Sequence, residues 1–275
     1  MNKTVHGSKA VKWLLIAISL IFLFFMLVMP LIVVIVEALR NGWTTYKEAL
    51  TDEYTIKALQ LTLRAAVISV VLNTIFGVFA AWVITKFKFK GKKLLTTLID
   101  IPFAVSPIIA GLIFTLTFGR IGWAYDFLEA YDIQIVFAVP GIILATIFVT
   151  FPFISREIIP VLSAQGSDEE EAAALMGAGG FTIFRKITLP HIKWALLYGV
   201  ILCTARAMGE FGAVSVVSGH LRGITNTLPL HVEILYNEFN FSAAFAVSSI
   251  LVIIAVMILI LRNIVEYKGK KAGEK

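Results

Sequence analysis

The chain has 275 residues, of which 59% are hydrophobic and only 15% are charged, and its mean hydropathy is +0.88. These values lie outside the range of soluble globular domains, so a soluble fold is excluded and an integral membrane protein is predicted. The net charge of +6 does not indicate a nucleic-acid partner, because the basic residues gather at the ends of apolar stretches. Cationic side chains in such positions face anionic lipid headgroups.

Six stretches are apolar and long enough to cross a bilayer core, which takes about 20 residues per helix. They predict an all-α integral membrane protein of about six transmembrane helices, at 13–36, 58–85, 95–118, 135–154, 194–217 and 243–261. The first stretch is too long for a secretory signal and no cleavage site follows it, so an uncleaved first span is expected. The single cysteine, Cys203, excludes a disulfide within the chain and is interpreted as a small buried residue.

Two prolines, Pro102 and Pro107, fall inside the third stretch and predict a kink. The carbonyl groups that a kink frees need partners or water, which suits a helix that lines or gates a pore. Asp100, early in the same stretch, is interpreted as a solvated or capping carboxylate in preference to a gating residue.

The distribution of Lys and Arg predicts how the spans are oriented. With both termini inside, 17 of the 24 basic residues lie on the cytoplasmic side, in groups before the first span, at 86–93, in the loop at 155–193 and from 262 onward. Short basic loops resist translocation, so both termini are expected in the cytoplasm. The expected organisation is a cytoplasmic tail at 1–12, a transmembrane domain at 13–261 that includes the cytoplasmic loop 155–193, and a basic cytoplasmic tail at 262–275.

The loop at 155–193 is long for a connector, so it is expected to carry structure of its own. Ser167 and Glu170 match a capping box that opens a helix, and the acidic residues around them suit the positive end of its dipole. The alanines that follow favour a helix and have little bulk, so this helix can present a flat surface to a partner.

Glycines at 177, 179 and 180 are expected to end this helix, and a second short helix is predicted at 181–187, closed by Pro190 before the fifth span. The alternative is an amphipathic helix on the membrane surface, with Phe181, Ile183 and Phe184 among the headgroups. The acidic first turn opposes that alternative, because anionic lipid would repel it.

Arg206 and Glu210 lie four residues apart in the fifth stretch, so a continuous helix would place them on one face. Arg206 comes twelve residues after Trp194, about 18 Å along a helix and near the middle of the membrane. Charges at that depth cost about 2.5–3.5 kcal/mol each on insertion scales, so the pair must face each other, a neighbouring helix or a pore. Two roles of this pair stay equally open: it can line a translocation path, or it can be a structural pair that holds the helix in the bundle. Gly209 and Gly212 would permit close approach of another helix.

The segment before the last stretch carries His220, His231, Glu233 and Glu238. Their spacing does not match a metal-binding pattern, and no metal site is predicted. Docking to an external partner and an ordinary polar loop stay equally open for this segment.

The run Glu171-Ala172-Ala173, then Gly177, then Ile187-Thr188-Leu189-Pro190 resembles the cytoplasmic EAA signature of permease subunits of ABC importers. A resemblance to the CysW-type subunits of sulfate/thiosulfate importers runs from the first span to the last. It is carried by the segments 100–107 (DIPFAVSP), 151–153 (FPF), 205–214 (ARAMGEFGAV) and 225–233 (TNTLPLHVE). Molybdate and tungstate permeases share parts of this pattern, and Phe181 stands where many relatives have Trp.

The resemblance implies a type I ABC importer permease fold in the bacterial cytoplasmic (inner) membrane. It implies a second permease subunit, a paralogue, that completes the pore, two ATP-binding subunits beneath, and an external sulfate-binding protein. The residues expected to couple this chain to the ATPase are Glu171, Ala172, Ala173, Gly177, Ile187, Leu189 and Pro190. The residues expected along the path, with Arg206 lending positive potential to sulfate, are Pro107, Arg206, Gly209, Glu210 and Gly212.

No phosphate-binding loop of the form G-x-x-x-x-G-K-[ST] occurs, so ATP with Mg²⁺ is expected to be used by a partner, and no cofactor is predicted in this chain. A molybdate or tungstate permease is the nearest alternative. A secondary anion transporter would show inverted repeats, and none is evident. A membrane-embedded enzyme would need a nucleophile with a partner or a metal cluster in the spans, and this alternative ranks last.

Overall fold

The computed structural model describes residues 9–273, and the secondary structure within them is helical. Two short π-helical turns, η1 and η2, interrupt the series. In chain order the elements are α1 (Lys9–Leu23), η1 (Phe24–Val28), α2 (Met29–Leu39), α3 (Trp43–Thr51), α4 (Glu53–Lys86), α5 (Lys92–Ala104), α6 (Pro107–Phe118), α7 (Tyr125–Ala130), α8 (Val139–Thr150), α9 (Pro152–Gln165), α10 (Asp168–Leu175), α11 (Gly180–Ile183), η2 (Phe184–Thr188), α12 (Leu189–Met208), α13 (Gly212–Ser218), α14 (Leu228–Asn237) and α15 (Phe241–Gly273).

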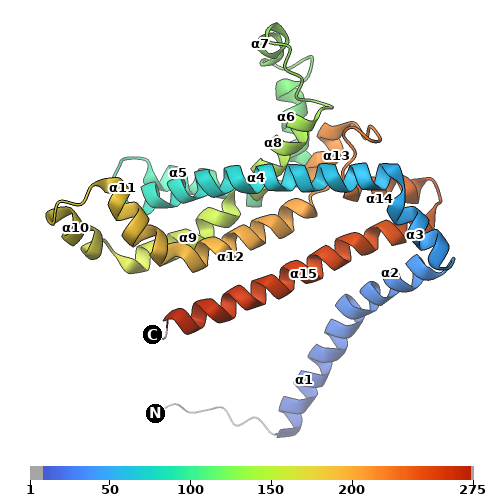
Figure 1. The fold of residues 1–275 in the computed structure, drawn as a ribbon, viewed down its shortest axis with the longest axis horizontal. Helices are drawn as coiled ribbons and strands as arrows, with labels where there is room; N and C mark the ends of the chain where they lie inside the picture. The colour runs from blue at the N-terminus through green and yellow to red at the C-terminus, as the bar shows by residue number, and fades with distance from the viewer. Residues whose placement is uncertain (1–8, 274–275) are drawn as a thin grey trace.

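The body of the molecule is a bundle in which α12 packs against α4, α9 and α15 along the long axis (Figure 1). Its largest core cluster is aliphatic and comes from α4, α9 and α12, with Cys203 fully buried in it, as predicted. The other members are Ala66, Val70, Val78, Ala81, Ile154, Ile158, Leu162, Ile192, Ala207 and Met208. Within a membrane such packing, more than exclusion of water, holds helices together.

Polar side chains add bonds between helices. Asn73 of α4 donates from Nδ2 to the Thr150 hydroxyl at 2.8 Å, and the Ser69 hydroxyl donates to the Ile143 carbonyl at 3.3 Å. The amide of Leu228 donates to the Thr62 hydroxyl at 2.7 Å. These bonds join α4 to α8 and to the start of α14, and each satisfies a group that would be costly to leave unpaired in an apolar interior.

Two parts of the chain extend from this body (Figure 1). The helices α6 and α8, joined through α7, form a hairpin, and α13 packs against both of them. At the other extreme, the apolar window of Val11–Leu39 has none of its residues buried, and α2 packs mainly on α15. Lipid or another protein must therefore cover most of this first span.

Five helices among the described residues are long and apolar enough to cross a membrane: Val11–Leu39, Glu53–Lys86, Val139–Gln165, Gly180–Met208 and Phe241–Gly269. A sixth span results if α5 and α6 are counted together, although they meet at 108°. The all-α prediction with about six spans is confirmed, and so is the kink in the third stretch. The break falls at Val105 and Ser106, directly before Pro107, since a proline disfavours helical backbone in the residue before it.

The predicted bounds of the fourth and fifth spans are wrong. The fourth helical run begins at Val139 and continues to Gln165, and the fifth begins at Gly180 and ends at Met208. The loop expected at 155–193 is therefore reduced to residues 166–179. Polar residues near the helix ends misled the hydropathy criterion, because a helix can extend past the apolar core of a bilayer.

The expectation that Pro190 closes a short helix is also wrong. The turn η2 precedes Leu189-Pro190, and the Leu189 amide donates to the Phe184 carbonyl, five residues back. Such a π turn makes room for a proline that lacks an amide hydrogen, so the helix continues through it. The same arrangement recurs at η1, which precedes Met29-Pro30 and in which the Met29 amide donates to Phe24.

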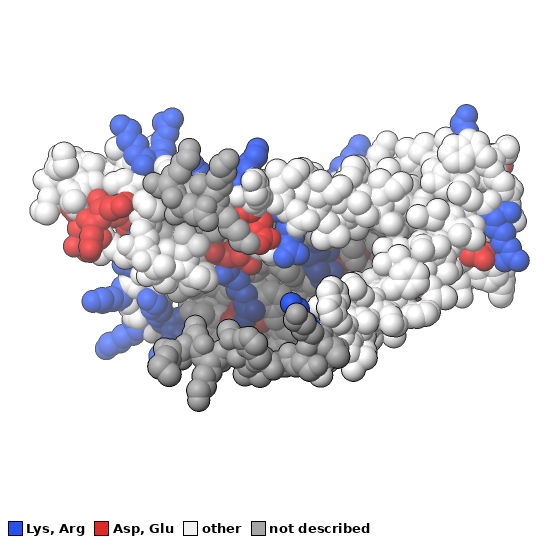
Figure 2. Space-filling model, turned by 90° about the horizontal axis from the view of Figure 1, so that it is seen from below, with Lys and Arg blue, Asp and Glu red and all other residues white. Residues whose placement is uncertain are grey.

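Charged side chains are distributed unevenly along the long axis. Lys, Arg, Asp and Glu are spread over the half of the molecule that carries α10 and α11, and a largely uncharged stretch separates them from a smaller charged group at the α3 end (Figure 2). Helix α15 continues to Gly273, so it includes most of the tail predicted at 262–275. Likewise α1 begins at Lys9, inside the predicted tail at 1–12, of which residues 1–8 lie outside the described part.

Candidate functional site

The loop between α9 and the fifth span carries α10, which contains the EAA run. Glu171 and Ala172 are exposed on α10, and Ala173 is half-buried. Leu175 and Met176, at the end of the same helix, are 90% and 89% exposed. A helix that leaves small and apolar side chains uncovered offers a surface suited to another protein.

The end of α10 explains the glycine of the EAA pattern. Gly177 has a φ of 88°, its amide donates to the Ala174 carbonyl, and the Ala178 amide donates to the Ala173 carbonyl. These two bonds around a left-handed residue form a Schellman motif, which ends a helix and satisfies its last carbonyls. The predicted end of the helix at Gly177 is confirmed.

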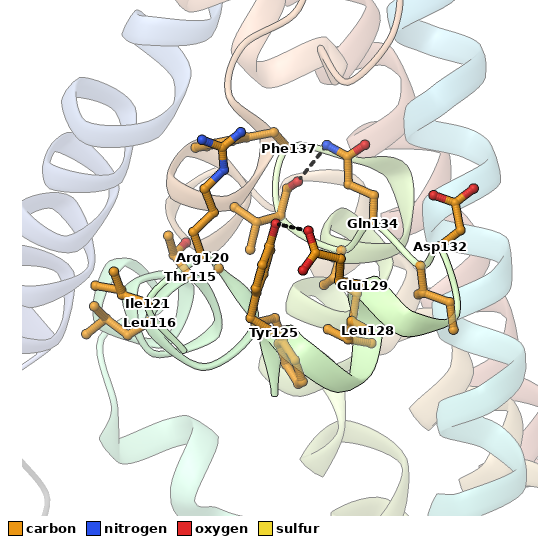
Figure 3. Close-up of a pocket in the computed structure, with 15 residues that line it drawn as sticks. Thr115, Leu116, Arg120, Ile121, Tyr125, Leu128, Glu129, Asp132, Gln134 and Phe137 are labelled. Carbon is orange, nitrogen blue, oxygen red and sulfur yellow. Dashed lines mark hydrogen bonds between the residues drawn. The ribbon is translucent and has the colours of Figure 1, made fainter. Parts of the chain in front are cut away.

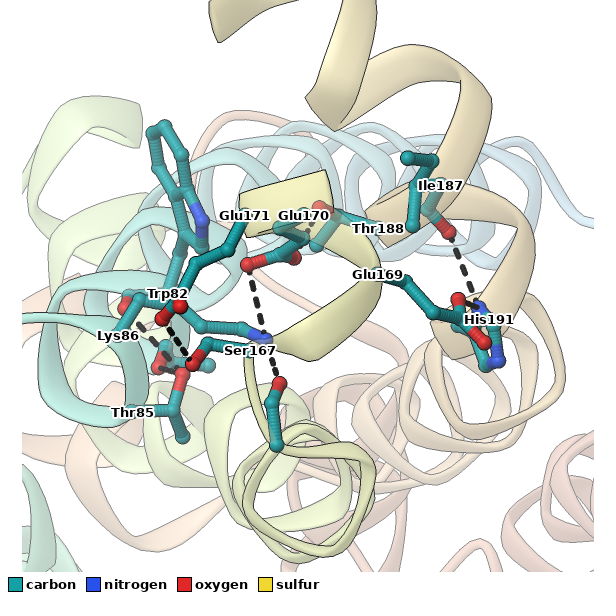
Figure 4. Close-up of polar contacts among 12 residues, drawn as sticks. Trp82, Thr85, Lys86, Ser167, Glu169, Glu170, Glu171, Ile187, Thr188 and His191 are labelled. Carbon is teal, nitrogen blue, oxygen red and sulfur yellow. Dashed lines mark hydrogen bonds and ion pairs between the residues drawn. The ribbon is translucent and has the colours of Figure 1, made fainter. Parts of the chain in front are cut away.

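The start of α10 differs from the predicted capping box. The Ser167 hydroxyl donates to Glu171 Oε1 at 2.6 Å and makes no bond to a first-turn amide. Glu170 turns away from the cap: its Oε1 accepts from the Thr188 hydroxyl at 2.6 Å, and its Oε2 lies 3.0 Å from Lys86 Nζ (Figure 4). The sequence pattern identified the start of the helix but not the partners of its acids.

The second half of the predicted coupling residues, Ile187, Leu189 and Pro190, lies beside the core. Leu189 and Phe184 pack against the main core cluster, and Phe184 also lies 5.5 Å from Trp82, measured between ring centroids. Ile187 is half-buried, whereas Pro190 is exposed. Of the three residues proposed for a surface helix, Phe181 alone is free, at 77% exposure, so they do not form one lipid-facing stripe.

The five candidate path residues gather at a second break, where α12 ends and α13 begins. Arg206 lies in the last turn of α12, but Glu210 lies beyond it, so the prediction that both occupy one continuous helix is wrong. They still meet: Arg206 Nη1 is 2.6 Å from Glu210 Oε2, with side chains 32% and 1% exposed. Glu210 Oε1 also accepts from the Ala213 amide at 2.8 Å, which caps α13.

The two glycines of this region have different surroundings. A Cβ added to Gly212 would lie 3.0 Å from the Pro107 Cβ, so the two broken helices α5–α6 and α12–α13 meet here. The predicted close approach is confirmed at Gly212 but not at Gly209, whose nearest contact for a Cβ would be 3.8 Å away. Irregular backbone at membrane depth is tolerated where it is enclosed by protein or lines a water-filled space.

Asp100 has a definite partner near the start of the third span. Its Oδ1 lies 2.9 Å from Arg156 Nε, and the Arg156 guanidinium lies over the Phe103 ring. The Asp100 side chain is 36% exposed, in agreement with a solvated carboxylate, and its ion pair with Arg156 joins α5 to α9.

A cleft in the described part of the chain lies elsewhere, between the end of α6, α7 and residues 132–137. It measures about 690 Å³ and carries charges of both signs, Arg120, Glu129 and Asp132 (Figure 3). The Tyr125 hydroxyl donates to Glu129 at 3.1 Å, a bond that raises the pKa of that phenol. None of the predicted path residues lines this cleft, and its mixed charges do not favour an anion.

The charged residues before the last span form ion pairs with one another. His220 Nε2 lies 3.2 Å from Glu233, and Arg222 Nη2 lies 2.5 Å from Glu238. His231 is 2% exposed, and its ring nitrogens face the Thr55 hydroxyl at 3.1 Å and the Asn226 side-chain amide at 3.2 Å. The described residues contain no cluster of three or more potential metal ligands.

Comparison with known proteins defines the class. The chain superposes on a chain of the solved bacterial alginate ABC transporter in complex with an alginate pentasaccharide-bound periplasmic protein, with a TM-score of 0.77, 17% identity, and 96% of each chain covered. The fold is thus that of an ABC importer permease. The profile of the family described as "binding-protein-dependent transport system inner membrane component" matches residues 73–270, and the chain belongs to this family.

Curated relatives narrow the comparison. The sulfate transport system permease protein CysW of Synechocystis sp. is 48% identical over 258 residues, 94% of each chain. The sulfate transport system permease protein CysT of Salmonella typhimurium is 34% identical, over 88% of this chain and 87% of that protein. The chain is therefore a multi-pass inner-membrane permease subunit of an ABC importer and not itself an enzyme, and no cofactor is expected in it.

Proposed function

We propose that this chain is the sulfate-transporting permease subunit of an ABC importer, working with a paralogous permease subunit, an ATPase dimer and an external sulfate-binding protein. The similarity to CysW over nearly the whole of both chains carries the assignment of sulfate. The CysT match supports a paralogue as the second permease subunit, because both are permeases of sulfate transport systems. The alginate complex with a periplasmic protein supports an external delivery protein.

The orientation follows from the charges. The basic group at 86–93 lies at the α10 end of the molecule, and Arg262, which donates to the Tyr198 hydroxyl at 3.0 Å, begins the basic part of α15. Retention of basic loops on the inside supports a cytoplasmic position for α10 and for both termini. The outer end then carries α3, α14 and the His220–Glu233 pair.

In this proposal α10 is the element that the ATPase moves. Its exposed EAA face and the uncovered side chains of Leu175, Met176 and Phe181 form the docking surface. Beyond the Gly177 turn, one helical run from Gly180 to Met208 passes through η2 and carries Arg206 in its last turn. A displacement of α10 can therefore reach the break at Glu210 through a stiff element, because the helical run is continuous. At about 1.5 Å per residue it links the two regions over its whole length.

The path for the anion is proposed at the meeting of the two broken helices. Arg206 retains 32% side-chain exposure beside a buried Glu210, so its guanidinium can present positive charge to a passing anion. An Arg206→Lys exchange tests this role: uptake is lost while the complex assembles normally, because a lysine cannot reproduce the bidentate geometry of a guanidinium. Assembly and uptake that both survive Arg206→Ala would contradict a path role and a structural role alike.

Sulfate-stimulated ATP hydrolysis by the reconstituted complex tests the function as a whole. The complex is placed in proteoliposomes, the binding protein is loaded in turn with sulfate, thiosulfate, molybdate or tungstate, and hydrolysis and uptake are measured. Sulfate is expected to stimulate both. Stimulation by molybdate or tungstate alone would reassign the anion, and hydrolysis that none of the four stimulates would contradict oxyanion import.

A further inference from the structure

Lys86, the last residue of α4, differs from the lysines that follow it. Its side chain is only 9% exposed, whereas Lys88, Lys90 and Lys93 are exposed. A buried ammonium group is unfavourable unless a counter-charge and hydrogen-bond acceptors surround it. Lys86 has both: Glu170 Oε2 lies 3.0 Å from Nζ, and Nζ also donates to the Gly166 carbonyl.

These contacts connect four separate parts of the chain. Lys86 belongs to α4, Gly166 to the turn after α9, Glu170 to α10 and Thr188 to η2, and Figure 4 shows the Lys86 ammonium group pointing at Glu170. Glu170 is shared, because its second oxygen accepts from the Thr188 hydroxyl at 2.6 Å. Thr188 is 1% exposed, and the Glu170 side chain is 14% exposed, so the network is shielded from water.

The neighbouring acids of α10 do not share this environment. Glu171 is exposed and bonds within its own helix start, to Ser167. Glu169 lies 3.6 Å from His191, and both side chains are largely exposed. Exposed ion pairs contribute little to holding two elements together, whereas removing one partner of a buried pair is strongly unfavourable. Among the described contacts of α10, those of Glu170 are thus the buried ionic ones.

We infer that Lys86 is a positioning residue for coupling: through Glu170 and Thr188 it fixes α10 to α4 and to the start of the fifth span. This inference rests on the proposed role of α10 as the ATPase docking element. Without the contacts among Lys86, Glu170 and Thr188, α10 remains docked to the ATPase but moves independently of the spans. Its other connections are the turns at 166 and 177, both with glycines at positive φ. ATP hydrolysis is then uncoupled from transport, so less sulfate is imported per ATP hydrolysed.

The test uses the complete complex in proteoliposomes and the Lys86→Met variant, which keeps an unbranched side chain only one heavy atom shorter and removes the charge. Three quantities are measured: the amount of ATPase that co-purifies, the stimulation of ATP hydrolysis by sulfate-loaded binding protein, and sulfate imported per ATP hydrolysed. Co-purification is expected to be unchanged. Stimulation and the transport ratio are expected to fall about tenfold, within the usual range for coupling between two sites.

A matched control comes from the same basic segment. Lys90→Met removes one exposed charge and is expected to leave all three quantities unchanged. Glu170→Gln is expected to reproduce the Lys86→Met result, and the double variant to lose no more than either single variant, since the two residues act as one unit.

Several outcomes would overturn the inference. They are a normal transport ratio in Lys86→Met, an equal loss in Lys90→Met, or additive losses in the double variant. If Lys86→Met does not assemble, Glu170→Gln decides, because it keeps the shape of the side chain and its bond to Thr188, and normal coupling in it overturns the inference. Failure of the proposed function is recognised separately, because the unmodified complex would then bind no ATPase or show no sulfate stimulation.

Discussion

Glu210 has different partners for its two carboxylate oxygens. Oε1 accepts the Ala213 amide hydrogen, and Oε2 faces the Arg206 guanidinium at 2.6 Å as an ion pair without a regular hydrogen-bond geometry. With 2% of the residue exposed, the carboxylate depends on both contacts to remain charged inside the protein. The same side chain therefore starts α13 and orients Arg206.

The two roles of Glu210 can be separated by substitution. Glu210→Gln keeps an oxygen for the Ala213 amide and removes the charge, and it is expected to destabilise the complex by about 1–3 kcal/mol through the unpaired Arg206. Glu210→Ala also loses the cap, which adds about 1 kcal/mol. Thermal unfolding of the purified complex measures both. Equal stability of the two variants would show that the cap contributes nothing.

The role of His231, for which the sequence left two alternatives, can be inferred from its burial and its hydrogen bonds. Its Nδ1 faces the Asn226 side-chain amide, which donates, so Nε2 carries the hydrogen and donates to Thr55. Burial lowers the pKa of His231, and Arg222 lowers it further, while Asp52 and Glu238 oppose the shift. A buried, neutral imidazole with both nitrogens bonded is a structural element of the outer end, and this favours the polar-loop interpretation for His231.

This shift predicts a pH dependence of stability. The unfolded chain protonates His231 near its usual pKa of about 6.5, and the folded chain does so only at lower pH. The stability from neutral His231 is therefore complete above that value and is lost as pH falls toward the folded pKa. His231→Gln is expected to destabilise the complex by about 1–2 kcal/mol at pH 7.5 and by less at pH 5.5. A gap between the two proteins that widened on acidification would contradict this sign.

Among the elements, α10 has a defined capping motif at its C-terminal end but no side-chain cap at its start. Gly177 at φ 88° closes a Schellman motif, and Gly179 beside it has an ordinary negative φ of −70°. A Cβ at either position would meet no atom within 4 Å. The two glycines therefore differ in backbone strain alone, which makes them a matched pair.

Gly177→Ala is expected to cost about 1–2 kcal/mol at this turn, because a side chain disfavours the left-handed backbone. The turn then relaxes, α10 is presented at a different angle, and less ATPase co-purifies with the complex. Gly179→Ala is expected to be neutral, since it introduces neither strain nor a clash. Equal losses of ATPase in the two variants would show that the open surface, and not the turn, requires glycine.

Two pairs of broken elements set the geometry of the proposed path. α5 and α6 meet at 108° before Pro107, and α12 gives way to α13 across Gly209–Phe211. They are packed so closely that a Cβ on Gly111 would lie 2.5 Å from the Ala213 carbonyl oxygen. Small residues let two backbones approach in this way, and the contact joins the proline break to the helix that Glu210 caps.

At the scale of the whole molecule, the proposed orientation predicts which residues each side of the membrane can reach. The one native cysteine, Cys203, is fully buried, so the unmodified chain is expected not to react with a membrane-impermeant maleimide. Lys90→Cys is expected to react only from the cytoplasmic side, in inside-out vesicles. Phe239→Cys, at a position 80% exposed between α14 and α15, is expected to react only from the outside. The reverse pattern would invert the topology.

The amino-acid sequence was enough to predict the class of protein. Its hydropathy required helical spans, because each backbone polar group in a bilayer must be bonded within its own segment or a closed barrel. Pro107 located the break in the third span, and Gly177 located the end of α10. The EAA run and the resemblance to sulfate permeases led to the family that comparison then confirmed. These features depend on local backbone chemistry and on overall composition, and both can be read directly from the amino-acid sequence.

The bounds of the spans and the partners of the charged side chains became known only from the folded structure. Hydropathy ended the fourth span near Ile154 and began the fifth at Trp194, but the packing of α9 and α12 on α4 carries both helices further. Lys86 looked like one of five basic residues at a span end, and Glu170 looked like a helix cap. Their pairing joins positions 84 residues apart, and Thr188 completes it. Such contacts depend on how helices pack and which atoms are shielded from water, and no local pattern encodes that.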